Sequence, residues 1–272
     1  MLKKSAISLI SYDAEYLPDS ISKYYRYVDE IVLGLDKDRI SWSNNPFKFD
    51  ENKLWKDLKT LDKDNKIEVI EENFHPSTIP IENDNYERNF LKEKCTHDWI
   101  FSFDADEELL NAKHFFQKFV PLAEPYYKKY DWMFTWLTPW KEIDDKTLII
   151  ANEDNSFHRE TPQGFLTHKH NTYKYARWTN NQKQMMTPLV VLHWSLCRTE
   201  ENLQQKINNI GHSDIANEDP FFQNWKNTTM ENWDQLRNFK TSGFGNNQWP
   251  KIVCVETKDL RYHAESQLEL SY

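Results

Sequence analysis

Short apolar runs alternate with amphipathic segments over the first 110 residues of the chain. Each run has the length of a strand and is followed by polar or acidic residues, so strands are predicted at 6–11, 30–36, 66–71 and 98–103. Between the runs, the spacing of apolar residues predicts helices at 17–28, 51–62 and 84–95. This alternation indicates a largely parallel α/β sheet with helices on both faces.

The pattern changes after Val120, where long polar segments separate the apolar runs. Further strands, in part antiparallel, are predicted at 131–137, 147–151 and 189–194. Residues 152–187 are rich in Asn, Gln, His and Lys with little apolar periodicity, which is typical of a binding loop or lid. A helix is predicted at 199–211, with Thr199 as its cap and Gly211 at its end.

The length of 272 residues favours one large domain with a smaller appendage. We expect a main domain at 1–198, with halves of about 1–110 and 111–198. Residues 199–272 are expected to form a small, mainly helical C-terminal extension that packs on it.

Composition narrows the classes of partner. The net charge of −9 argues against nucleic acid or an anionic bilayer as the main partner. Cys95, Cys197 and Cys254 are far apart without a CxxC pair, which is typical of reduced cysteines. No apolar run approaches the roughly 20 residues of a membrane-spanning helix. The N-terminal run breaks at Tyr12-Asp13 and predicts a strand rather than a signal peptide. A cytoplasmic location is expected, with peripheral attachment to the inner membrane face as an option.

Four carboxylates follow the strand predicted at 98–103 within five positions: Asp104, Asp106, Glu107 and Glu108. Crowding them costs Coulombic repulsion unless a cation or separation relieves it. If residues 98–106 are extended, Asp104 and Asp106 point to one side and can approach one hard cation. Alternatively, Asp106 caps a helix over 107–120, with the two glutamates in its first turn. That second interpretation leaves Asp104 unexplained.

Asp13, Asp36 and Asp104 each come directly after a predicted strand. Ligands of open α/β sheets gather at the carboxyl ends of the strands, so this coincidence predicts a binding site at one edge of the sheet.

The run NYERNFLKEKCTHDWIFSFDADEEL resembles the core signature of family 2 glycosyltransferases of the GT-A fold, a mixed sheet flanked by helices. With the β-α-β pattern at the start of the chain, the resemblance covers residues 6–110. The later run VVLHWSLCRTEENLQQKINNIGHSD resembles a segment of bacterial members of the family, in which a strand ends in His before a helix.

The resemblance implies roles for particular residues. Asp36 is expected to face the uracil or ribose of a nucleotide donor and Asp13 to lie near the base. Arg88 is expected near the nucleotide or sugar. Asp104 is expected to contact the ribose or a metal-bound water, and Asp106 to ligate Mn²⁺ or Mg²⁺ directly, so both enter the predicted metal site. His193 is the candidate third ligand; a partly buried His bonded to a backbone carbonyl is the competing interpretation. His212 is the runner-up, and His168 and His170 are weaker candidates.

The implied activity is metal-dependent transfer of a hexose, glucose being one option, from a UDP-linked donor to a glycan or glycoprotein. The family is mostly inverting, which requires a general base, for which Glu153 and Asp154 are the candidates. Arg198 and Lys206 are candidates to steady the diphosphate. The tryptophans are either sugar-stacking platforms or core residues. Assembly into a homo-oligomer is compatible with the sequence.

Two other classes of function compete with this one. One is a catalytically silent glycan-binding or scaffold subunit of a glycosylation complex. The other is a sugar nucleotidyltransferase, although a chain with only five glycines offers no Gly-rich phosphate loop.

Overall fold

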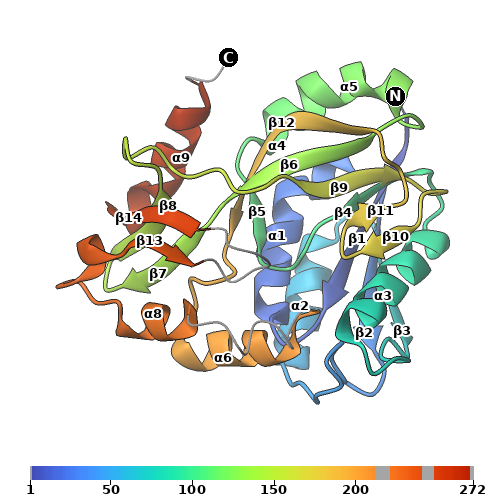
Figure 1. The fold of residues 1–272 in the computed structure, drawn as a ribbon. Coiled ribbons are helices and arrows are strands. Elements are labelled where there is room, and N and C mark those ends of the chain that lie inside the picture. The colour runs from blue at the N-terminus through green and yellow to red at the C-terminus, as the bar shows by residue number, and fades with distance from the viewer. Residues whose placement is uncertain (1, 212–220, 241–247, 270–272) are drawn as a thin grey trace.

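The computed structural model of the chain describes residues 2–211, 221–240 and 248–269. An eight-stranded mixed sheet forms its centre, in the order β3-β2-β1-β4-β9-β6-β12-β5 (Figure 1). Its strands are β1 (Lys4–Ile10), β2 (Glu30–Asp36), β3 (Ile67–Glu72), β4 (Trp99–Ser102), β5 (Glu107–Leu109), β6 (Asp131–Leu137), β9 (Gln163–His168) and β12 (Gln184–His193). The predicted α/β architecture, a mixed sheet flanked by helices, is confirmed.

Strand direction brings the candidate residues to one edge of this sheet. β1 runs parallel to β2 and β4, and β6 runs parallel to β12. β9 is antiparallel to both β4 and β6, so the two parallel groups point the same way. The carboxyl ends of β1, β4 and β12 therefore share an edge, and the residues that follow these strands meet there.

Both faces of the sheet are covered because both sets of alternating side chains are apolar. On β1, Ala6 and Ile10 belong to the cluster that includes α1 and α2, whereas Ile7 and Leu9 pack with Leu91 of α3. The helices are α1 (Leu17–Tyr24), α2 (Glu51–Leu61), α3 (Pro80–Lys94), α4 (Ala112–His114) and α5 (Val120–Ala123). A π-helical turn, Phe115–Phe119, joins the last two.

A second, four-stranded antiparallel sheet lies beside the first, in the order β13-β14-β8-β7. Its strands are β7 (Pro139–Ile143), β8 (Lys146–Ala151), β13 (Arg237–Lys240) and β14 (Gln248–Glu256), and the helices near it are α6 (Glu200–Asn209), α8 (Phe221–Asn227) and α9 (Leu260–Glu269). The C-terminal extension thus contributes helices and also two strands. β14 pairs with β8 along six residues, so this sheet includes strands from both sides of residue 198. Trp140 and Trp249 lie in its apolar core with Leu203 of α6.

Two segments differ from the sequence prediction. Residues 107–109 form β5, paired antiparallel with β12, instead of starting a helix, which begins only at Ala112. The segment 152–187 contains β9, the short hairpin β10 (Tyr173–Tyr175) and β11 (Trp178–Thr179), and the start of β12. In both cases pairing with a distant strand decides the structure, and local periodicity does not report it.

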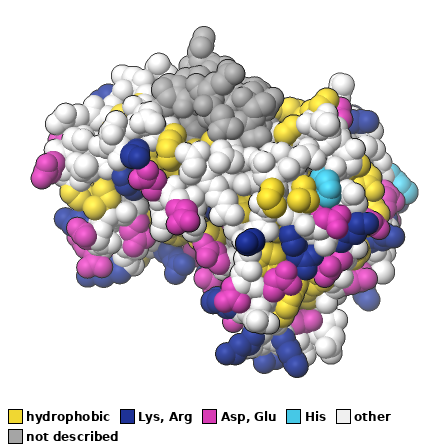
Figure 2. Space-filling view, turned by 90° about the horizontal axis from the view of Figure 1, so that it is seen from below, with side chains coloured by type: hydrophobic (Ala, Val, Ile, Leu, Met, Phe, Trp, Pro, Cys, Tyr) yellow, Lys and Arg dark blue, Asp and Glu magenta, His cyan; other side chains and the backbone are white. Residues whose placement is uncertain are grey.

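The surface in Figure 2 carries acidic and basic side chains interspersed over the visible face. None of the helices in the described part of the chain is both long and apolar enough to span a bilayer.

Candidate active site

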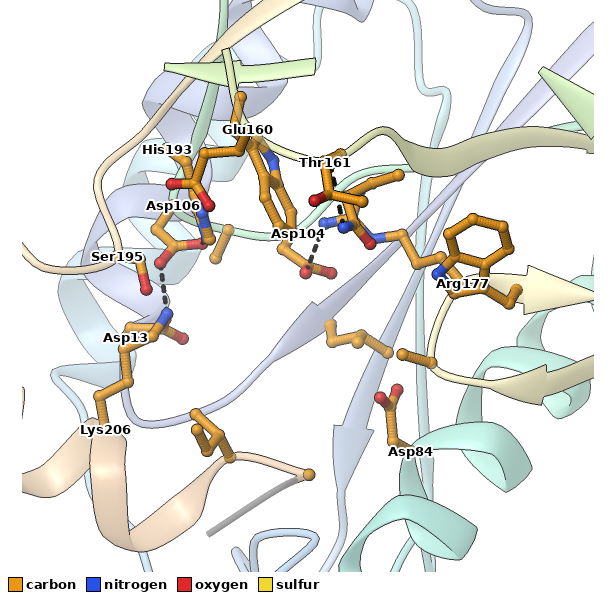
Figure 3. A pocket seen from close by; sticks show the side chains of 18 of the residues that line it. Asp13, Asp84, Asp104, Asp106, Glu160, Thr161, Arg177, His193, Ser195 and Lys206 are labelled. Carbon is orange, nitrogen blue, oxygen red and sulfur yellow. Dashed lines mark hydrogen bonds and ion pairs between the residues drawn. The ribbon is translucent and has the colours of Figure 1, made fainter. Parts of the chain in front are cut away.

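A pocket of about 830 Å³ lies at the carboxyl edge of the central sheet (Figure 3). Its floor comes from the residues after β1 and β4 and from the end of β12. The other walls come from α3, α6, the segment 158–163 before β9 and the hairpin residues 175–178. The predicted gathering of strand ends therefore produces a real cavity.

Asp104 faces this pocket between two arginines. Its Oδ1 accepts a hydrogen bond from Arg88 Nη2 of α3 at 2.9 Å, and its Oδ2 accepts one from Arg177 Nη2 of the hairpin at 2.7 Å. Burial opposes ionisation, but the two guanidinium groups prevail and lower the pKa of Asp104. Asp104 is consequently a fixed carboxylate at any ordinary pH.

Asp106 has a different set of cations. Its Oδ2 accepts from Arg198 Nη2 at 2.5 Å and from Lys206 Nζ of α6 at 2.6 Å. Its Oδ1 lies 3.7 Å from His193 Nε2 at the end of β12. Although the carboxylate is buried, the charged Lys206 and Arg198 hold the pKa of Asp106 well below the ordinary value. Asp106 is therefore also ionised.

The cations also explain how the chain tolerates its acidic cluster. Glu107 pairs with Arg177 at 2.6 Å, and Glu108 pairs with Arg261 at 2.6 Å and Lys23 at 3.2 Å. Each of the four crowded carboxylates thus has a basic side chain of the protein against it. Arginine and lysine supply the compensation that the cluster requires.

The condition under which both aspartates would point to one side is not met, because the strand does not continue to residue 106. β4 ends at Ser102, and the N–H of Glu107 donates to the carbonyl of Asp104 at 3.3 Å in a turn before β5. The turn directs the two carboxylates to separate partners, although both line the same pocket.

The predicted three-ligand metal set is not assembled. Among residues 2–211, 221–240 and 248–269, no three His, Cys, Asp or Glu side chains are grouped to hold a metal ion. Both oxygens of Asp104 are engaged by arginines. Asp106 Oδ1 and His193 Nε2 do face each other, and this pair fits Mg²⁺ or Mn²⁺, which take few protein ligands beside substrate phosphates and water. The cation itself stays a prediction.

His193 is suited to that role by its protonation state. Its ring stacks on Trp136, with centroids 4.2 Å apart. Burial is the main cause that lowers the pKa of His193 to about 3, against the opposing effect of Asp106. The ring is therefore neutral near pH 7, which is the form that binds a metal.

The predicted nucleotide contacts divide into two groups. Asp13 and Arg88 line the pocket: Asp13 accepts from Arg198 at 3.0 Å, and Arg88 reaches Asp84 at 2.6 Å as well as Asp104. Asp36 is not among the lining residues. Its carboxylate accepts backbone N–H groups of the chain that follows β2, including Ile40 at 3.0 Å. Asp36 therefore organises a turn instead of lining the pocket.

The predicted general bases lie elsewhere. Glu153 and Asp154 are exposed in the turn after β8 and are not among the pocket residues. Asp154 accepts from the Ser156 N–H at 2.9 Å, and Glu153 lies 3.7 Å from Arg237. His168 and His170 lie beyond the pocket lining near Tyr127, and His212 falls outside the described residues.

The charged pocket residues that the sequence did not predict include Glu160 and Arg177. Both belong to the polar segment 152–187, whose composition did indicate a binding loop. Neither stands in a periodic pattern or a motif, and Arg177 meets Asp104 across 73 positions of sequence. The pocket is also lined by aromatic residues that were not singled out for it: Trp42, Tyr175 and Trp249.

Comparisons with known proteins find only remote likenesses in structure. No protein-family model and no curated relative matches the sequence. Solved structures with some likeness include S. aureus TarS (10% identity, 86% of this chain, 45% of that chain, TM-score 0.39). A second is S. aureus TarS 1-349 in complex with UDP-GlcNAc (12% identity, 53% of this chain, 36% of that chain, TM-score 0.30). A third is 4-diphosphocytidyl-2C-methyl-D-erythritol synthase (13% identity, 62% of this chain, 75% of that chain, TM-score 0.35).

The chain spans less than half of the length of these TarS chains. At TM-scores below 0.5, the function has to be argued from the site itself.

Proposed function

We propose that this protein is a glycosyltransferase that moves a hexose from a nucleoside-diphosphate sugar, UDP-linked, to a glycan or glycoprotein acceptor. One observation carries the proposal. Lys206 and Arg198 converge on Asp106 at the carboxyl edge of the sheet, inside a pocket walled by tryptophans. Cations beside a carboxylate suit a diphosphate, and aromatic walls suit a base and a sugar.

The size of the pocket agrees with such a donor. Its volume of about 830 Å³ lies within the roughly 300–1,000 Å³ typical of small-molecule sites. Trp42, Trp136, Trp178 and Trp249 each contribute to the lining, so flat rings are available on several sides. These surfaces fit a uracil ring or the apolar face of a hexose.

Lys206 is the cation best placed to meet a phosphate. Its side chain is 13% exposed and lines the pocket, whereas Arg198 is 1% exposed and lies beneath Asp106 and Asp13. A diphosphate that enters can accept from Lys206 Nζ while Arg198 keeps both aspartates compensated. Mn²⁺ or Mg²⁺, held by Asp106 and His193, would add charge neutralisation of the leaving diphosphate.

A panel of UDP- and GDP-sugars, screened by thermal shift with and without Mn²⁺, tests donor binding, since a bound ligand raises the melting temperature. We expect UDP-sugars to stabilise the protein. Lys206→Met should weaken donor binding by about 10–100-fold, that is by roughly 1.4–2.8 kcal/mol. The matched control is Lys226→Met, because Lys226 is 49% exposed in a surface pair with Glu200 and lies outside the pocket lining.

Turnover separates this proposal from its rivals. UDP release from UDP-glucose, measured with Mn²⁺ and again with a chelator, should be present in the first case and strongly reduced in the second. A silent binding subunit releases no UDP in either case, and a nucleotidyltransferase consumes or releases pyrophosphate instead. Equal stabilisation by UDP-sugars of the Lys206→Met and wild-type proteins would contradict the assignment of the diphosphate to Lys206.

A further inference from the structure

Five carboxylates line the pocket, and one of them differs from the rest in its partners. Four are paired with basic side chains: Asp13 with Arg198, Asp84 with Arg88, Asp104 with Arg88 and Arg177, and Asp106 with Arg198 and Lys206. The fifth is Glu160, which has no ion pair among the described residues. Its partners there are neutral hydrogen-bond donors, the Thr138 hydroxyl and the Trp249 indole.

We propose that Glu160 is the general base that takes the proton from the acceptor hydroxyl; this rests on the proposed function. In Figure 3 its carboxylate points into the pocket from the side opposite Lys206 and Asp13. If the diphosphate lies against Lys206, the donor sugar extends away from it across the pocket. An acceptor that attacks from the face opposite the diphosphate then approaches on the side of Glu160.

The backbone and two side chains fix Glu160 in this position. Its N–H donates to the carbonyl of Trp136 at 3.0 Å, which ties the segment before β9 to the end of β6. The hydroxyl of Thr138, just beyond β6, donates to Oε1, and the indole of Trp249 on β14 donates from the second sheet. Three separate parts of the chain therefore orient one carboxylate.

The surroundings also suit the group to accept a proton near neutral pH. Burial raises the pKa of Glu160 to about 7, and the two donors only partly offset this. The charged or titratable groups that line the pocket around it are His158 and Arg159 on its own segment, His193 on β12 and Asp106 after β4. The pKa values of the ion-paired aspartates Asp104 and Asp106 are instead held low, so these two are poor proton acceptors.

The step balances without an additional reactant. The acceptor oxygen forms a bond to the anomeric carbon while the bond from that carbon to the diphosphate oxygen breaks. The electron pair of the broken bond stays on the leaving nucleoside diphosphate. The acceptor O–H proton moves to the Glu160 carboxylate, which is left neutral and later loses the proton to solvent. In donor hydrolysis, water takes the place of the acceptor in the same step.

The test compares Glu160→Gln with the wild type in hydrolysis of UDP-glucose with Mn²⁺, followed by UDP release. Because glutamine keeps the size of the side chain and its acceptor oxygen, we expect donor binding within about 3-fold of the wild type. The rate should fall by about 10²–10⁴-fold, the usual contribution of general base catalysis. Glu153→Gln makes the same change in the exposed turn and should leave the rate unaltered.

The pH profile provides the readout that a structural role would not change. Wild-type kcat/KM should rise tenfold per pH unit below about pH 7 and level off above it, and Glu160→Gln should lose this limb. A Glu160→Gln rate within 3-fold of the wild type overturns the assignment, as does a wild type that binds UDP-glucose but releases no UDP between pH 5.5 and 9. Failure of the wild type to bind any nucleotide sugar overturns the proposed function itself.

Discussion

The floor and the far wall of the pocket shift the pKa values of their carboxylates in opposite directions. On the floor, Asp104 and Asp106 lie against arginines and a lysine that lower their pKa values. On the wall, Glu160 is held by neutral donors, and burial raises its pKa to about 7. The comparison shows that the partners of a carboxylate, more than its burial, decide whether it acts as a fixed charge or as a proton acceptor.

Removing Arg177, the wall cation that pairs with Asp104 and Glu107, should have the largest effect on stability. Arg177→Met leaves Glu107 buried, with 0% exposure of its side chain, and without its basic partner. Breaking a buried ion pair in this way costs about 3–5 kcal/mol. Urea unfolding measures the loss, with Arg237→Met as the control, because that arginine is 47% exposed and its pair with Glu153 is worth about 0–1 kcal/mol. Similar losses in both variants would mean that the floor is not specially stabilised.

The next largest effect is expected on turnover, when a carboxylate on the floor is neutralised. Asp106→Asn keeps the shape of the side chain, and Arg198 retains Asp13 as its partner. We expect UDP release to fall by about 10²–10³-fold, as when one electrostatic group is lost from an active site. The control is Asp57→Asn on the surface of α2, where the aspartate pairs with Lys53. Turnover of Asp106→Asn near the wild-type level would remove Asp106 from the mechanism.

The raised pKa of Glu160 on the wall should make the stability of the protein depend on pH. The pKa of Glu160 is about 7 in the folded protein and about 4.5 in the unfolded chain. The folded state therefore binds this proton more tightly, so its stabilising contribution is complete below pH 4.5 and is lost as pH rises to 7. The free energy of unfolding should decline across this window relative to Glu160→Gln, by roughly 3 kcal/mol at most. Parallel curves for the two proteins between pH 4.5 and 8 would contradict the raised pKa.

The sequence predicts the floor better than the wall. Short two-sided apolar strands that end in acids indicate that Asp13 and Asp104 meet at one sheet edge, and both do line the pocket. The same rule failed for Asp36, because its oxygens accept backbone N–H groups such as that of Phe74 at 2.8 Å. A strand-end aspartate that binds backbone and one that faces a ligand have the same local sequence.

The wall could not be located in this way, because its residues depend on contacts distant in sequence. Glu160 is oriented by Thr138 and by Trp249, which lies in the C-terminal extension. Arg177 lies between two short strands, and no apolar periodicity in the sequence predicts them. The composition of segment 152–187 is typical of a binding loop. Which of its charged side chains line the pocket depends on the tertiary fold.

Crystals of the protein with UDP and Mn²⁺, measured by anomalous diffraction at the manganese edge, would locate both the diphosphate and the metal. We expect the diphosphate against Lys206 in the pocket, and manganese beside the phosphates, Asp106 and His193. A nucleotide bound outside the pocket, or inside it with its phosphates remote from Lys206 and Arg198, would contradict the account.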